Sequence, residues 1–116
     1  MWTVRTKKEG SEVLVPGYKK YIIRKLLYDK EQIGSGAMWK HLIEIMGDNH
    51  PSRASVIFFL NDLVDSGYAS YISATGKGGH HRLYYTELTS EEFIVKISED
   101  INAKLVEAIS IILNNP

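Results

Sequence analysis

The sequence predicts an α+β fold, mainly α, built as one domain from 116 residues. Three observations predict it. Apolar residues recur at every third or fourth position over several segments. Two tyrosine-rich segments flank a glycine-rich loop, and the last segment of the chain is long and carries apolar residues at helical spacing. A chain of this length buries a single hydrophobic core. We therefore divide it into a body, residues 1–88, and a C-terminal helix, residues 89–116.

The composition excludes several classes of protein. A content of 44% hydrophobic and 24% charged residues is ordinary for a soluble globular domain. Cysteine is absent, which excludes disulfides, thiolate catalysis and cysteine-based metal sites and suits a reducing interior. The longest apolar runs are too short to span a bilayer, and residues 1–10 lack the apolar stretch of a secretory signal. A cytoplasmic protein without membrane association is expected.

The formal net charge is zero, but it is unevenly distributed. Residues 1–88 hold 12 Lys and Arg against 9 Asp and Glu, so their charge is 12 − 9 = +3. Residues 89–116 hold 2 Lys and Arg against 5 Asp and Glu, so their charge is 2 − 5 = −3. The body is therefore mildly basic, which suits a polyanionic partner better than the overall charge does.

The first part of the chain predicts a hairpin followed by a basic helix. Trp2–Thr6 and Glu12–Val15 have strand composition, and Gly10 suits the turn, so residues 1–15 form a possible N-terminal hairpin. After Pro16-Gly17, the apolar spacing predicts a helix over Tyr18–Tyr28. Its polar positions are basic: Lys19, Lys20, Arg24 and Lys25.

Two further helices follow. The first is expected to begin with Ser35 as its N-cap and to end at Gly47, with one apolar face. That face holds Met38, Leu42, Ile45 and Met46. The second is expected over Ser52–Ser66, because Ser52 is a good N-cap after Pro51 and Gly67 suits the position after the helix. Its apolar face holds Val56, Phe59, Leu60, Leu63 and Val64.

The opposite face of the Ser52–Ser66 helix carries short polar groups, one cation and two apolar side chains. These residues are Arg53, Ser55, Ile57, Phe58 and Asn61, with Ser52 at the start. In a helix-turn-helix, the N-terminal part of the second helix enters the major groove of DNA. There arginine binds guanine, asparagine binds adenine, and apolar groups touch the thymine methyl. This helix is therefore the predicted recognition helix.

A hairpin is predicted next. Tyr68–Ser73 and Arg82–Leu88 are rich in aromatic and β-branched residues, and the loop Thr75–Arg82 between them contains three glycines. We call this loop the wing. Its glycines permit close backbone approach, and its cations suit phosphates or the minor groove. The candidate DNA contacts of the wing are Lys77, Gly78, His80, His81 and Arg82, to which Lys19 and Lys20 add backbone contacts.

The C-terminal segment predicts a long helix that needs a partner. Thr89 and Glu92 form a capping box, and the helix should run to about Leu113. Apolar residues lie along it at steps of three and four, and the small body offers limited surface to cover them. A homodimer built on this helix is therefore expected. The predicted dimer residues are Phe93, Ile94, Ile97, Ile101, Leu105, Ala108, Ile109 and Ile112.

The order helix, helix-turn-helix, two-stranded wing, long C-terminal helix predicts a winged helix-turn-helix with a C-terminal dimerisation helix. The segment from Ser52 to Leu88, with its stretches LVDSGY and GKGGHHRLYY, resembles winged-helix transcriptional repressors of the penicillinase-repressor and PadR groups. The resemblance covers about residues 18–113. It implies a homodimeric repressor on a palindromic operator of double-stranded DNA. Exposed Ile57 and Phe58, acidic Asp62 and Asp65, and the N-terminal strands depart from the family pattern.

Alternative interpretations concern individual residues. Phe58 is expected to pack against a neighbouring element rather than to touch DNA. His80 and His81 are not expected to bind one metal ion together, because the side chains of adjacent strand residues point to opposite faces of the strand. No catalytic constellation, nucleotide-binding motif or cofactor site is present in the sequence, so an enzyme is not expected, and no effector is indicated. The alternative function is a protein-interaction module without DNA binding, with Ile57 and Phe58 as anchors.

Overall fold

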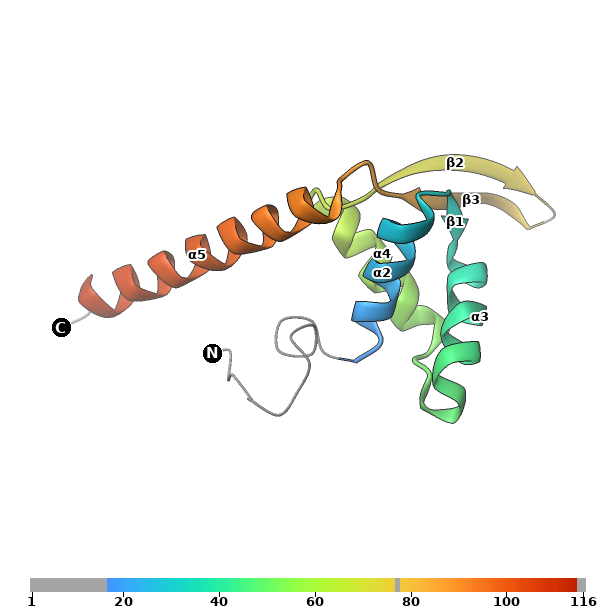
Figure 1. Cartoon of the computed structure of the whole chain (residues 1–116), viewed down its shortest axis with the longest axis horizontal. Coiled ribbons are helices and arrows are strands. Elements are labelled where there is room, and N and C mark those ends of the chain that lie inside the picture. Colours follow the sequence, from blue (N-terminus) through green and yellow to red (C-terminus); the bar gives the residue numbers. More distant parts are fainter. Residues whose placement is uncertain (1–16, 77, 115–116) are drawn as a thin grey trace.

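The computed structural model describes residues 17–76 and 78–114 and is mainly helical with one small sheet, as predicted (Figure 1). The helices are α2 (Lys19–Asp29), α3 (Ser35–Met46), α4 (Arg53–Asp65) and α5 (Ser90–Asn114). The strands are β1 (Ile33–Gly34), β2 (Ser70–Gly76) and β3 (Gly79–Tyr85), and a 3₁₀ turn, η1, covers Gly47–Asn49. The hairpin predicted within residues 1–15, and Lys77 of the wing, lie outside the described residues.

Helices α3 and α4 form the predicted helix-turn-helix. Gly47 ends α3 with a positive φ of 59°, a conformation that costs glycine little. The turn is fixed from α3, because Nε1 of Trp39 donates to the carbonyl oxygen of Pro51 at 3.0 Å. The ring of Trp39 also meets that of His50 edge-on, with centroids 5.8 Å apart. Trp39 therefore holds the turn that sets the direction of α4.

The two helix starts differ from each other. Ser52 caps α4 as predicted, since its Oγ accepts from the backbone N–H of Ser55 at 3.1 Å. Ser35 does not cap α3. Gly34 occupies the N-cap position with extended backbone, and Ser35 is already the first helical residue. The reason is the short strand β1, which draws Ile33 and Gly34 into the sheet and leaves no room for a cap one residue later.

The sheet is antiparallel with the order β1-β3-β2. Strand β3 pairs with β2 in a register that places Tyr71 opposite Tyr84 and Gly76 opposite Gly79. The expected strand ends were wrong, because pairing continues to Gly76 and resumes at Gly79. Most of the predicted wing loop is therefore extended strand, and only residues 77–78 connect the two. The wing is a long paired ribbon rather than an open loop.

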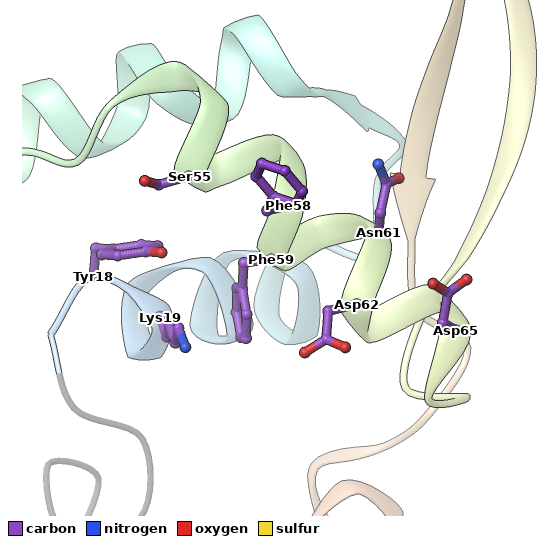
Figure 2. A pocket seen from close by; sticks show the side chains of 8 residues that line it. All are labelled: Tyr18, Lys19, Ser55, Phe58, Phe59, Asn61, Asp62 and Asp65. Atoms are coloured by element: carbon purple, nitrogen blue, oxygen red, sulfur yellow. The ribbon is translucent and has the colours of Figure 1, made fainter.

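The start of α2 packs beside α4 (Figure 2). The ring of Tyr18 meets that of Phe59 edge-on with centroids 6.4 Å apart, and Nζ of Lys19 lies 5.2 Å from the centroid of Phe59. Phe59, on the inner side of α4, therefore fixes where the basic end of α2 lies. This contact places Tyr18 and Lys19 at the edge of the outer face of α4.

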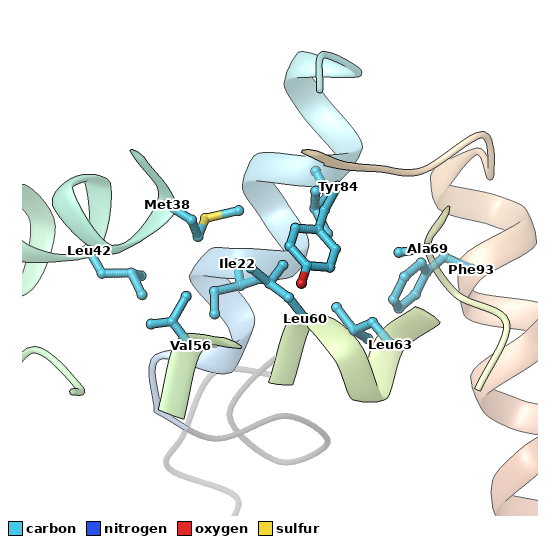
Figure 3. Close-up of a cluster of buried hydrophobic side chains, with 10 residues drawn as sticks. Ile22, Met38, Leu42, Val56, Leu60, Leu63, Ala69, Tyr84 and Phe93 are labelled. Carbon is cyan, nitrogen blue, oxygen red and sulfur yellow. The ribbon is translucent and has the colours of Figure 1, made fainter. Parts of the chain in front are cut away.

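One hydrophobic core joins the four helices described above to β1 and β3 (Figure 3). The three helices α2, α3 and α4 supply most of it, and Ala69 just before β2, one residue from β3 and one from α5 complete it. The buried residues are Ile22, Leu26, Met38, Leu42, Val56, Leu60, Leu63, Ala69, Tyr84 and Phe93. Their spacing of three and four along each helix is the spacing from which the sequence predicted the helices.

Helix α5 begins at the predicted capping box and then leaves the body (Figure 1). The backbone N–H of Thr89 donates to Oε1 of Glu92 at 3.0 Å, and that of Glu92 donates to Oγ1 of Thr89 at 3.1 Å. Its first turns are anchored on Tyr68, whose hydroxyl donates to Asp100 and whose ring packs against Phe93. Residues 102–114 are all exposed. No helix in the described part of the chain has the length and apolarity to cross a membrane.

Candidate nucleic-acid interface

The outer face of α4 is the centre of the candidate site. Together with the start of α2 it lines an open surface pocket of about 560 Å³ (Figure 2). The lining residues are Tyr18, Lys19, Ser55, Phe58, Phe59, Asn61, Asp62 and Asp65. The pocket thus brings together Ser55, Phe58 and Asn61 of the predicted recognition set with one of the two lysines predicted on α2.

Phe58 does not pack against a neighbouring element, so that expectation was wrong. Its side chain is 77% exposed, whereas Ile57 is half-buried. The reason is helical geometry: Phe59 and Val56 face the core, which turns Phe58 toward solvent. An exposed aromatic side chain on a polar helix face is available to a binding partner.

The N-terminal end of α4 presents serines and an arginine. Ser52 and Ser55 hydrogen-bond each other through their hydroxyls at 2.9 Å, in addition to the capping bond. The guanidinium of Arg53 lies over Gly36 in the first turn of α3, where an added Cβ would come within 3.3 Å of it. Arg53 is nevertheless exposed. This end therefore offers one cation and two hydroxyls on an ordered helix start.

A hydrogen-bond network joins α4 to the wing. Oδ1 of Asn61 accepts from Nη1 of Arg82 at 3.0 Å and from the hydroxyl of Tyr84 at 2.6 Å. The guanidinium of Arg82 stacks on Tyr71, with Cζ 3.9 Å from the ring centroid. Burial raises the pKa of Tyr84, so its hydroxyl keeps its proton and remains a donor at neutral pH. Two residues predicted as separate DNA contacts, Asn61 and Arg82, are therefore bonded to each other.

The other residues of the wing are exposed. His80 and His81 lie on β3 opposite Thr75 and Ala74, and both are solvent-accessible, as is Gly78 at the tip. A Cβ added at Gly76 would meet the ring of His81 at 3.2 Å, so this ring crosses the hairpin. Among the described residues, no group of three or more His, Cys, Asp or Glu is placed to hold a metal ion.

The charges around α4 are mixed. Lys19 lies beside the pocket, and Nζ of Lys20 lies 5.1 Å from the ring centroid of Tyr21. Asp62 and Asp65 are exposed, and both belong to the last turns of α4. The cations and hydroxyls gather near the start of α4 and on the wing, whereas the carboxylates gather near its end. A polyanion would therefore be favoured at the start of the helix and disfavoured at its end.

The residues predicted for dimerisation divide into two groups. Phe93 is 4% exposed and belongs to the core of its own chain, so it is not part of an exposed stripe. Ile97 packs against the core, and Ile101 is half-buried. The others are exposed: Ile94, Leu105, Ala108, Ile109 and Ile112. The free apolar surface therefore lies mainly in the second half of α5, where the helix has left the body.

Ile109 is the centre of that free surface. Positions three and four residues before and after it on a helix are its neighbours. All four are exposed and apolar: Leu105, Val106, Ile112 and Leu113. Val106 was not among the predicted residues, because the predicted stripe was centred on the line through Ile101, which is half-buried.

Sequence reasoning also missed Tyr71, Tyr84 and strand β1. The signal for the tyrosines was the hairpin register: with a two-residue connection at 77–78, Arg82 lies opposite Ser73 and diagonal to Tyr71. From the sequence we expected a longer loop, Thr75–Arg82, and so did not predict that Arg82 pairs with β2. Strand β1 has two residues and exists only through its pairing with β3, so no local pattern could reveal it.

These elements define the fold class: a helix-turn-helix followed by a two-stranded wing on a three-stranded sheet and by a long C-terminal helix is a winged helix. Two solved structures share it. One, from Thermoplasma acidophilum, is assigned to the transcriptional regulators (TM-score 0.50, 18% identity, covering 83% of this chain and 88% of that one). The other is a PadR-family transcriptional regulator from Eggerthella lenta (TM-score 0.50, 15% identity, 83% of each chain).

At these identities the similarity concerns the fold alone. No family model matches the chain, and no curated protein sequence matches it. One of the two solved structures belongs to the PadR group that the sequence resembles. The resemblance to the penicillinase-repressor group stays a prediction.

Proposed function

We propose that this protein is a homodimeric, sequence-specific DNA-binding transcriptional regulator, and that it acts as a repressor. The observation that carries the proposal is the joining of the outer face of α4 to the wing through Asn61 and Arg82. This bond makes one continuous surface from the two elements that a winged helix lays on DNA. The regulators that share the fold support the same function.

In this proposal α4 enters the major groove by its start and lies in it as far as Asn61. Arg53, Ser55 and Asn61 meet base edges, and the capped helix start favours the phosphates nearby. The wing lies along the backbone or minor groove, and Lys19 and Lys20 neutralise phosphates beside α2. Asp62 and Asp65 follow Asn61 along α4, where the helix leaves the groove, which agrees with insertion of the helix by its start.

The exposed half of α5 supports the proposed dimer. The helix carries a solvent-exposed apolar patch around Ile109, and removing this patch from water stabilises the protein. The α5 helix of a second, identical chain can bury it in a two-fold dimer. Two chains then present two copies of α4 to one duplex. Bound at a promoter, the dimer represses by excluding other proteins.

Fluorescence anisotropy with duplex DNA at several salt concentrations tests the proposal. If two chains together neutralise about six phosphates, the plot of log K against log salt has a slope of about −5. Lys77→Ala reduces its magnitude by about one for each phosphate that is no longer neutralised, whereas Arg53→Ala removes a base contact and relaxes the preference at that base pair. Lys104→Ala, which removes the same charge from the exposed half of α5, leaves the slope unchanged. Binding that is absent, or insensitive to salt, overturns the proposal.

A second candidate function is a protein-interaction module without DNA binding. The observation that favours it is Phe58, 77% exposed beside the carboxylates of Asp62 and Asp65. Such a surface suits a partner with an apolar and a basic side chain. The same titrations separate the two functions, because the module shows no salt-dependent binding to any genomic fragment.

A further inference from the structure

We infer that Asn61 is a specificity-determining residue that presents only hydrogen-bond donors to DNA and therefore selects guanine over adenine. The inference rests on the proposed DNA-binding function and adds a base preference to it. It replaces the sequence-based expectation that Asn61 binds adenine. The orientation of one side-chain amide carries it.

The partners of Asn61 fix that orientation. Its Oδ1 accepts from Nη1 of Arg82 at 3.0 Å and from the hydroxyl of Tyr84 at 2.6 Å. A guanidinium has five N–H donors and no acceptor, so the amide atom that faces it must be the oxygen. In Figure 2 the oxygen of Asn61 lies on the side of the sheet and its nitrogen on the side of Phe58.

Both partners are themselves held in place. Arg82 stacks on Tyr71, with Cζ 3.9 Å from the ring centroid, and this contact keeps the guanidinium on the α4 side of the wing. Tyr84 is 3% exposed and packed in the core, so its hydroxyl cannot turn away from α4. The carbonyl oxygen of Asn61 has two lone pairs, and two fixed donors use them.

The chemistry of base recognition then gives the preference. Asparagine reads adenine by accepting from N6 through its oxygen while its nitrogen donates to N7. In this protein the oxygen is already engaged, and the two N–H groups of Nδ2 remain. Guanine offers two adjacent acceptors, N7 and O6, which match those donors. Adenine places an N–H donor beside N7, and cytosine offers a donor only, so both are disfavoured.

Selection of binding sites from a randomised duplex pool tests the inference. The base read by Asn61 is the one whose preference disappears in Asn61→Ala. In the wild type we expect guanine there, roughly tenfold over adenine, since a good pair discriminates by this order. The double variant Arg82→Met with Tyr84→Phe frees the oxygen, and the tenfold ratio falls to about one or reverses toward adenine.

Tyr84→Phe alone separates the two partners of Asn61. Its ring keeps filling the core and Arg82 still fixes the amide, but one lone pair of Oδ1 is freed, so the preference for guanine should fall by less than in the double variant. In the double variant, loss of the Arg82 charge weakens binding to all DNA sequences alike. The ratio of guanine to adenine among the selected duplexes therefore reports only the change at Asn61. Circular dichroism of each variant confirms that the body remains folded.

The outcomes separate this inference from the function on which it rests. Selection of adenine by the wild type, or a preference that is unchanged in Asn61→Ala, overturns the inference and leaves DNA binding intact. Retention of the tenfold preference in the double variant also overturns it. If the wild type enriches no duplex and shows no salt-dependent binding, the proposed function fails and the inference fails with it.

Discussion

At the scale of single residues, the fold depends on a few side chains that hydrogen-bond the ends of helices. Ser52 starts α4, and Thr89 with Glu92 starts α5. Each satisfies backbone N–H groups that have no partner within the helix. These residues fix where the candidate DNA-reading helix and the candidate dimer helix begin, so they determine the geometry of both surfaces.

The capping box of α5 predicts a pH dependence of stability. The hydrogen bonds from Thr89 lower the pKa of Glu92 below its ordinary value of 4.5. A carboxyl group whose pKa is lowered by folding stabilises the fold above its unfolded pKa, and the contribution is lost as the pH falls through the folded pKa. Thermal unfolding between pH 5 and pH 3 should therefore show a smaller loss of stability in Glu92→Gln than in the wild type. Equal losses would contradict the linkage.

Single residues were predictable where local sequence decides their role. Ser52, Thr89 and Glu92 are recognisable because caps depend on neighbours in the chain. Asn61 and Arg82 were predicted as exposed contacts, but their bond to each other depends on strand register and could not be read locally. Phe58 was predicted to be covered. In the structure it is 77% exposed, because its position on α4 turns it away from the core that Val56 and Phe59 face.

At the scale of elements, periodicity predicted the four helices of the described residues to within about two residues. The sheet was less predictable. Strand β1 depends on β3, and the lengths of β2 and β3 depend on a two-residue connection that composition alone did not indicate. Composition at the tip of the hairpin, rich in glycine, suggested a loop where the backbone in fact continues to pair.

Helix α5 carries the prediction at this scale. Ile109→Asp places a charge at the centre of the free apolar patch, so burying that patch against a second chain becomes unfavourable. The mass in light scattering should fall from two chains to one. Ile111→Asp makes the same substitution two residues later, about 200° around the helix and therefore on its opposite side, and should leave two chains. A single chain in the wild type, or two chains in Ile109→Asp, would show that the patch does not pair α5 helices.

At the scale of the whole molecule, the charge differs between the two candidate surfaces. The mildly basic body carries α4 and the wing, and the acidic C-terminal helix carries the apolar patch around Ile109. The anchoring of α5 on Tyr68 fixes the angle at which that helix leaves the body. In a dimer this angle sets the distance between the two copies of α4, and so the spacing of two half-sites on DNA.

Hydroxyl-radical footprinting of the tightest-binding duplex tests the central claim most directly, because it reports DNA binding and the number of reading helices together. A dimer that lays two copies of α4 on one face predicts two protected patches of related sequence. Their centres should lie about one helical turn, 10 to 10.5 base pairs, or a multiple of it apart. A single protected patch, or none at saturating protein, would contradict the account.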